Sequence, residues 1–296
     1  MALRDFALLF AICLVWGLNL VLTRFVVTEV PPLFYAFIRF FLVAIVLIPF
    51  LRRPPKQWGW ATLIGLCVGA GNFVLLFLAL KNGTASSIAV AGQIGLPIST
   101  ALSMIFLNEK VGWRRGLGMA MAGIGVVIIA YDPEEVALSL GVVLVICAAF
   151  VGSTGGIAMK KMDPIPIFEM QAWIALVSIP LPLALSLLWE ENQIGAALEM
   201  GLPFYAALAF SVIGVSIFGH GSFYHLVKRY DVTLLTPLTL MTPVWAVFFG
   251  VVLLNEELSM QLALGAIIAL SGVALIAVRP NLRFPDLAAF WRRPGA

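Results

Sequence analysis

The stretch Leu107–Val111 (LNEKV) recurs 147 residues further along the chain as Leu254–Leu258 (LNEEL). Glycines follow both copies at the same shift: Gly118 and Gly125 after the first, Gly265 and Gly272 after the second. Pro97 and Pro243 precede the two copies at nearly the same offset. Self-similarity over such a distance predicts that the chain consists of two related halves.

Long uncharged runs surround this repeat. Of the 296 residues, 62% are hydrophobic and 11% are charged, and the mean hydropathy is +1.05. A helix needs about 20 apolar residues to cross the hydrocarbon layer of a membrane. Runs without Asp, Glu, Lys or Arg cover 6–23, 57–80, 82–108, 116–131, 136–159, 170–189, 200–227, 232–255 and 258–278. A further run, 30–51, contains only Arg39, so we expect ten membrane helices.

The runs are continuous rather than alternating in polarity, so the backbone must satisfy its hydrogen bonds within helices. The sequence therefore predicts an all-α integral membrane protein, and the short connections leave no room for a soluble domain. The first run is long and lacks a convincing cleavage site, so we expect a retained helix rather than a signal peptide. Cys13, Cys67 and Cys147 fall inside the runs without metal-ligand spacing and are interpreted as packing residues.

The basic residues predict the orientation, because Lys and Arg are retained on the cytoplasmic side. One set of alternate loops holds Arg24 and Lys81 only. The other set, with the two termini, holds Arg4, Arg52, Arg53, Lys56, Lys110, Arg114, Arg115, Lys160, Lys161, Lys228, Arg229, Arg279, Arg283, Arg292 and Arg293. We therefore expect cytoplasmic N- and C-termini, in the inner (plasma) membrane.

Each half contains five expected helices, and an odd number forces the second half to enter the membrane upside down. We expect a first half over 1–132, a second, inverted half over 133–280 and a short cytoplasmic tail over 281–296. Inverted repeats around a central cavity recur in secondary transporters, where the two halves exchange conformations to open the cavity to either side.

The chain resembles the ten-helix EamA-like group of the drug/metabolite transporter superfamily. The resemblance rests on Trp16–Asn19 with Arg24, on Pro32 through Phe40, and on Pro97–Gly125 repeated as Pro243–Gly272. The second half departs from it, with Val151–Thr154 in place of the Trp-Gly-x-Asn string and Trp173 or a neighbour where Arg39 would recur. The resemblance implies a cavity among helices 1, 3, 4, 6, 8 and 9 and export of amino acids, including bulky apolar ones.

Polar groups deep in membrane helices are candidate site residues, because they are unfavourable unless they face protein or a water-filled cavity. Arg39 is either a bidentate partner for a substrate carboxylate or a structural anchor. The other groups either face the cavity or make interhelical hydrogen bonds of about 0.6 kcal/mol. Trp16, Tyr224 and Trp245 either stack on substrate or only pack. The predicted substrate-binding set is Trp16, Asn19, Thr23, Arg39, Asn72, Gln93, Ser153, Thr154, His220, Tyr224 and Trp245; Thr242 is a further polar candidate.

Prolines predict kinks in helices 4 and 9, because proline removes a backbone donor. These helices would be mates in the inverted repeat, and paired broken helices indicate a gate or binding site, although packing alone also explains kinks. The prolines are Pro97, Pro237 and Pro243.

Catalysis finds little support. His220 and His225 do not share a helix face, and the chain has no catalytic motif or paired intramembrane carboxylate. We therefore expect a transporter without metal or cofactor, with small-molecule substrates and lipid as partners, no nucleic acid, and a monomer or weak homo-oligomer. Uniport of amino acids is the leading hypothesis. Proton-coupled efflux of drugs or metabolites is the alternative, and a passive channel and a membrane enzyme are rivals.

Overall fold

A computed structural model describes residues 1–51, 56–108, 112–132, 137–227, 229–230 and 232–277. Within these ranges the side chains of Asp132, Ala137, Leu138, Tyr224, Val232 and Thr233 are not described. The predicted tail over 281–296, the Tyr224 side chain, and Glu109 and Lys110 of the first repeat copy thus lie outside the described part.

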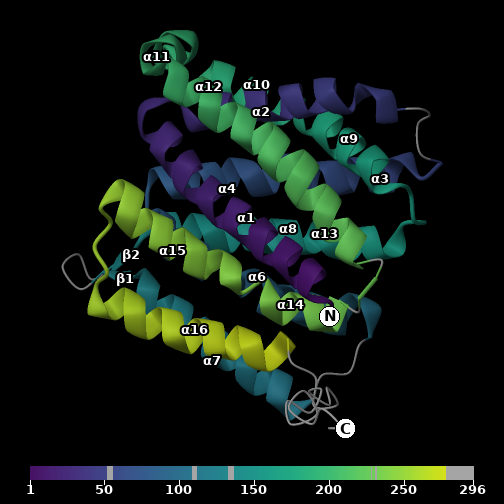
Figure 1. The fold of residues 1–296 in the computed structure, drawn as a ribbon, viewed down its shortest axis with the longest axis vertical. Helices are drawn as coiled ribbons and strands as arrows, with labels where there is room; N and C mark the ends of the chain where they lie inside the picture. Colours follow the sequence, from purple (N-terminus) through teal and green to yellow (C-terminus); the bar gives the residue numbers. More distant parts are fainter. Residues whose placement is uncertain (52–55, 109–111, 133–136, 228, 231, 278–296) are drawn as a thin grey trace, which may run out of the picture.

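The first half of the chain makes five crossings (Figure 1). The first is α1 (Leu3–Glu29), and the second is α2 (Pro32–Leu47) with the short η1 (Ile48–Phe50). The third joins α3 (Trp58–Ile64), η2 (Gly65–Gly71) and α4 (Asn72–Lys81), the fourth joins α5 (Ala85–Ala91), η3 (Gly92–Ile94) and α6 (Gly95–Leu107), and the fifth is α7 (Trp113–Ala130).

Two short strands, β1 (Tyr131–Asp132) and β2 (Ala137–Leu138), pair antiparallel between the halves. The second half then repeats the plan, with one extra surface helix, α11 (Gln193–Met200). Its crossings are α8 (Leu140–Lys161); α9 (Ile167–Ser178) with α10 (Pro180–Trp189); α12 (Leu202–Ala209), η4 (Phe210–Gly219) and α13 (His220–Val227); α14 (Val232–Leu238) with α15 (Met241–Leu254); and α16 (Met260–Ala277).

The ten predicted crossings are confirmed. Within the described residues, ten helical spans are long and apolar enough to cross a membrane. Both copies of the repeated stretch end a helix in the same way, with a left-handed asparagine: Asn108 with φ 52° and Asn255 with φ 53°. Asparagine adopts this conformation more readily than most residues and is therefore suited to ending a helix.

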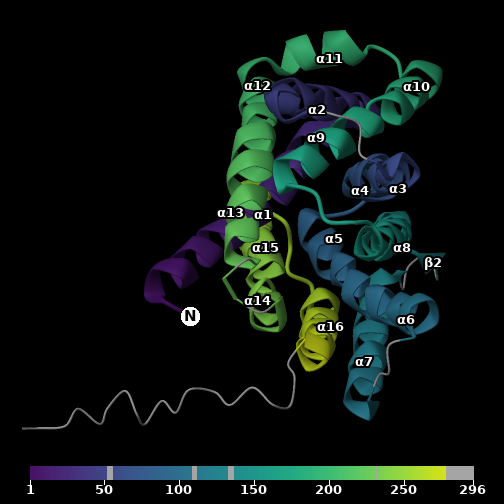
Figure 2. The same ribbon diagram turned by 90° about the vertical axis from the view of Figure 1, so that its right-hand side faces the viewer.

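The packing follows the inverted repeat. Helix α1 packs against α15, and its mate α8 packs against α6, the equivalent part of the other half. The last helices of the halves, α7 and α16, lie side by side at one edge of the bundle (Figure 2). The predicted fold class, an all-α protein of two inverted five-helix repeats, is confirmed.

Mated helices also share their irregularities. The third and eighth crossings each contain a π-helical segment, η2 and η4. The fourth crossing is interrupted by the 3-10 turn η3, three residues before Pro97, and the ninth breaks between Leu238 and Met241, next to Pro237 and Pro243. Such departures from the α-helix are frequent at functional sites, and within a membrane they require burial or a cavity.

The α7–α16 interface depends on glycine. A Cβ built on Gly125 would lie 2.4 Å from the backbone nitrogen of Ala269, and one on Gly272 would lie 2.5 Å from that of Ala122. Both contacts are with backbone, which cannot move aside as a flexible side chain can. The two helices therefore approach as closely as they do because these positions lack side chains.

We expect Gly125→Ala to lower the stability of the detergent-solubilised protein by about 1–3 kcal/mol, the usual effect of overpacking. Gly123→Ala is the matched control, because a Cβ there meets nothing within 4 Å. Thermal unfolding followed by fluorescence-detected gel filtration compares the two. Equal unfolding temperatures for both variants would contradict the close contact.

Candidate functional site

One end of the bundle is closed by polar contacts between crossings. This end, which we name the Glu256 end, lies at the left of Figure 1 with α11 and the β1–β2 pair. There Arg24 donates to the carbonyl oxygens of Leu80 and Lys81, at 2.7 and 2.8 Å. The carboxylate of Glu190 accepts from the backbone N–H groups of Leu33 and Phe34, at 2.8 and 2.9 Å. These bonds tie α1 to α4, and the chain after α10 to the start of α2.

Glu256 joins the two halves at the same end. Its carboxylate accepts from the backbone N–H of Ala85 at 2.6 Å, and from the N–H and hydroxyl of Ser86 at 3.0 and 2.5 Å. These are otherwise free donors of the first turn of α5, and the positive end of the helix dipole favours the carboxylate there. The residues that surround these contacts, Val26, Val27, Leu80 and Ile88, are at most 1% exposed. The Glu256 end is therefore sealed.

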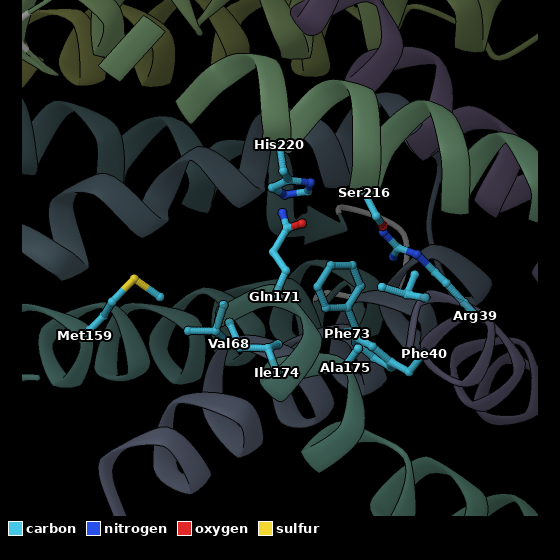
Figure 3. Close-up of a pocket in the computed structure, with 11 residues that line it drawn as sticks. Arg39, Phe40, Val68, Phe73, Met159, Gln171, Ile174, Ala175, Ser216 and His220 are labelled. Carbon is cyan, nitrogen blue, oxygen red and sulfur yellow. The ribbon is translucent and has the colours of Figure 1, made fainter. Parts of the chain in front are cut away.

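A cavity of about 120 Å³ lies on the other side of this seal (Figure 3). Its lining residues come from the second, third, sixth, seventh and eighth crossings, and both π-helical segments contribute to its wall. They are Arg39, Phe40, Val43, Val68, Phe73, Met159, Gln171, Ile174, Ala175, Ser216 and His220. Met159 and Gln171 lie close to the opposite end of the bundle, which we name the Trp58 end because α3 begins there. The cavity therefore occupies the middle of the bundle and its Trp58 half.

The cavity wall differs from the expected one. Helices 1, 3, 4, 6, 8 and 9 were expected to enclose it, whereas crossings 2 and 7 supply six of its eleven described lining residues and crossings 1, 4 and 9 supply none. The reason lies in the packing: α1 is held against α15, and α8 against α6, so these interfaces are filled by side chains. Crossings 2 and 7 instead face each other beside the two π-helical segments.

Arg39 is the charged group of the cavity. It is 3% exposed, and its guanidinium lies over the rings of Phe73 and Phe77, with centroids at 4.4 and 5.8 Å. Such cation–π contacts contribute about 0.5–2 kcal/mol each. The Nη1 atom has no hydrogen-bond partner within the part of the chain that the structure describes. None of the described residues that line the cavity is acidic.

Hydroxyl groups lie behind Arg39, toward the Glu256 end. The Tyr35 hydroxyl faces Ser211 and Thr23 as well as the Arg39 guanidinium. All three hydroxyl groups are buried, and none has a hydrogen-bond partner among the described residues. Rings of Phe77 and Phe204 pack on Tyr35, with centroids at 5.4 and 6.0 Å. The three hydroxyl groups therefore lie close enough to interact with one another without making a hydrogen bond of full geometry.

Two further polar side chains face the cavity from the Trp58 half. Gln171 of α9 extends toward the ring of His220, and the guanidinium of Arg39 enters beside Ser216 (Figure 3). The amide oxygen of Gln171 is buried and has no partner within the described residues. His220 Nδ1 lies 2.9 Å from the backbone carbonyl oxygen of Val215. Since a carbonyl only accepts, Nδ1 carries a proton, and in the neutral ring Nε2 is an acceptor.

Of the predicted substrate-binding residues whose side chains the structure describes, Arg39 and His220 line this cavity and the others do not. Gln93 and Thr154 bond to carbonyl oxygens of their own helices, at Ala89 and Phe150. Ser153 donates to Gly95 O at 3.1 Å, an interhelical bond. Asn72 packs against Gly152, and Asn19 and Thr23 are buried with unpartnered side-chain oxygens.

The predicted aromatic residues pack among other rings. The ring centroid of Trp16 lies 5.5 Å from that of His220 and 5.4 Å from that of Phe223, so Trp16 packs against the His220 ring. Trp245 forms a T-shaped pair with Phe10 at 5.2 Å and stacks on Phe249 at 5.8 Å. The Cβ atom of Trp245 lies against Gly17, so a Cβ atom added to Gly17 would come within 2.6 Å of it. Trp245 therefore fixes the α1–α15 contact.

The predicted substrate-binding set does not include Tyr35, Gln171, Ser211 or Ser216. Gln171 satisfies the same criterion that selected Gln93, an uncharged amide within an apolar run, but it stands near a helix end. The hydroxyl residues are common within membrane helices, and only the packing of α2 against η4 distinguishes Tyr35 and Ser211 from the others.

The sequence profile of the EamA-like transporter family matches the chain twice, over residues 5–131 and 139–278. The chain belongs to the EamA-like transporter family. This transporter is 31% identical to a protein of Salmonella typhimurium named "Probable amino-acid metabolite efflux pump", over 92% of this chain and 94% of that protein. Identity to the protein of the same name in Escherichia coli is 28%, over the same shares.

A more distant relative is also named as a transporter. The "Uncharacterized inner membrane transporter YedA" of Escherichia coli is 25% identical over 89% of this chain and 88% of its own length. A solved crystal structure superposes with a TM-score of 0.62 at 20% identity, covering 93% of this transporter and 96% of the other chain, which shows the shared fold. The molecule is thus a multi-pass inner-membrane transporter of small molecules.

We expect Glu256→Gln to loosen the sealed end of this EamA-like transporter, because hydrogen bonds to a charged group contribute about 1.5–3 kcal/mol each. Ala89→Cys, on buried α5, serves as the reporter after Cys13, Cys67 and Cys147 are replaced by alanine. Its reaction with a membrane-impermeant maleimide is expected to accelerate severalfold. Glu257→Gln removes the same charge one residue later and serves as the control. A labelling rate that Glu256→Gln leaves unchanged argues against the seal.

Proposed function

We propose that this transporter exports amino acids, including bulky apolar ones, and related metabolites by alternating access. The observation behind this proposal is Arg39: a buried cation with an unpartnered Nη1 in a cavity whose described lining has no acidic residue. A positive charge without a counter-ion in an apolar membrane interior is strongly unfavourable. A substrate carboxylate would supply the missing partner through charge-assisted hydrogen bonds.

The charge of the cavity also bears on the alternative. A cationic drug would be repelled by Arg39, whereas the carboxylate of an amino acid is attracted. The rest of the wall is largely apolar, with Val43, Val68, Met159 and Ile174 available to a hydrophobic side chain. The names of the Salmonella typhimurium and Escherichia coli relatives support the same substrate class.

The asymmetry between the two ends fits a transporter that takes up substrate from the cytoplasm, while the substrate gradient sets the net direction of uniport. The positive-inside distribution of Lys and Arg supports a cytoplasmic position for the Trp58 end and both termini. With the Glu256 end sealed, the cavity would then receive substrate from the cytoplasmic side. The moving units are the halves 1–132 and 133–280, with gates at the broken fourth and ninth crossings beside Pro97, Pro237 and Pro243. The hydroxyls of Thr23, Tyr35 and Ser211 would line the path that opens beyond Arg39.

Uniport is the mechanism we favour. Within the described residues, the cavity has no carboxylate to relay protons, so no acidic coupling site faces the substrate. Among the described lining residues, His220 has the side-chain type best suited to proton transfer, and it would be the proton carrier in a coupled mechanism. A pH-gradient arm in the assay below therefore distinguishes the two mechanisms.

The test is counterflow in liposomes that contain the purified full chain, with labelled L-leucine and L-phenylalanine first and then each of the other amino acids. We expect saturable exchange that excess unlabelled amino acid inhibits and that an imposed pH gradient does not change. A non-saturable flux would indicate a pore, an absolute requirement for the gradient would overturn uniport, and absence of exchange for all twenty amino acids would overturn the proposed substrates.

We expect Arg39→Met to weaken counterflow of L-phenylalanine by about tenfold or more, since a lost hydrogen bond to a charged group contributes about 1.5–3 kcal/mol. Arg39→Lys retains the charge without the two-pronged geometry, so it is expected to be intermediate. Arg229→Met is the control, since that side chain is 56% exposed and pairs with Asp5 outside the cavity. Wild-type transport by Arg39→Met would remove Arg39 from the site.

A further inference from the structure

The cavity holds two acceptors opposite its cation. On one side is the Arg39 guanidinium, and on the other are the unpartnered amide oxygen of Gln171 and the His220 ring (Figure 3). All three side chains line the same small cavity. One small ligand could therefore carry both a carboxylate that binds Arg39 and a hydrogen-bond donor that binds between Gln171 and His220.

The tautomer of His220 is set by the fold. His220 is the first residue of α13, and its ring Nδ1 contacts the carbonyl oxygen of Val215, five residues earlier in the π-helical segment η4. The proton on Nδ1 leaves Nε2 of the neutral ring as an acceptor. Trp16 packs against the ring, with centroids 5.5 Å apart, and restricts its rotation. The π-helical segment thus orients an acceptor that an uninterrupted α-helix would not hold in the same position.

We propose that Gln171 and His220 bind the α-ammonium group of the substrate while Arg39 binds its carboxylate. The preferred substrates are then zwitterionic α-amino acids, with the side chain against the apolar wall formed by Val43, Val68 and Ile174. This inference rests on the proposed function and extends it. It makes Gln171 the residue that gives the site a higher affinity for an amino acid than for the corresponding carboxylate without an ammonium group.

The acceptors explain why the site would hold an ammonium without a carboxylate partner. An ammonium group has three donors and no acceptor, so neutral oxygen and nitrogen acceptors satisfy it. A fixed carboxylate at this place would neutralise Arg39 and weaken its attraction for the substrate. A buried acceptor left unpartnered also discriminates strongly against ligands that lack the matching donor.

The experiment is inhibition of labelled L-phenylalanine counterflow in liposomes by three unlabelled compounds. These are L-phenylalanine, 3-phenylpropionate, which lacks the ammonium group, and phenethylamine, which lacks the carboxylate. In Gln171→Met we expect inhibition by L-phenylalanine to weaken about tenfold while that by 3-phenylpropionate stays within about twofold. In Gln171→Glu we expect phenethylamine to inhibit more strongly than in the wild type.

Gln193→Met is the matched control, because that amide bonds to the carbonyl oxygens of Ser186 and Glu190, outside the cavity. The inference is overturned if Gln171→Met weakens L-phenylalanine and 3-phenylpropionate by the same factor, which marks a structural role, or leaves both unchanged. If either result is found while the wild type still transports L-phenylalanine, the proposed function holds and only the role of Gln171 is wrong. A wild type that neither transports any amino acid nor is thermally stabilised by one overturns both.

Discussion

The hydrocarbon layer imposes the constraint on which the rest of this structure depends: every backbone N–H and C=O group within it must be bonded inside the protein. The chain meets this constraint with ten helical crossings. Departures from the α-helix are consequently confined to places where other protein groups or a cavity compensate. In the described residues they occur in the second, third, fourth, seventh, eighth and ninth crossings, which form three pairs of mates in the inverted repeat.

The cavity is a consequence of where those departures lie. The π-helical segments η2 and η4 widen the helix locally, and each contributes a residue, Val68 and Ser216, to the cavity wall. Elsewhere the crossings approach closely, as at α7–α16 and at Gly17 against Trp245, where added Cβ atoms would collide. Close packing at the edges and irregular backbone in the middle together leave Arg39 in the cavity wall, with its Nη1 atom unbonded among the described residues.

The same logic explains the sealed end. Carboxylates bind there to helix N-termini rather than to basic side chains: Glu190 at α2 and Glu256 at α5. Such contacts break without leaving a buried charge behind, because both the carboxylate and the helix end lie near the membrane surface, where water replaces the partner. An arrangement of this kind suits a gate that opens and closes.

The sequence by itself determined the number of crossings, the two halves and their inversion. The length of each uncharged run decides whether it can cross the membrane, the charges between runs decide its orientation, and the repeated Leu-Asn-Glu stretch marks the two halves. It also identified Arg39 and His220, since isolated polar groups in apolar runs are visible one residue at a time. Only the tertiary structure decided which crossings surround the cavity. Gln93 bonds to its own helix while Gln171 faces Arg39, and nothing in composition distinguishes two amides in apolar helices. That difference is set by helix rotation and by the π-helical segments, which depend on packing between residues far apart in the chain.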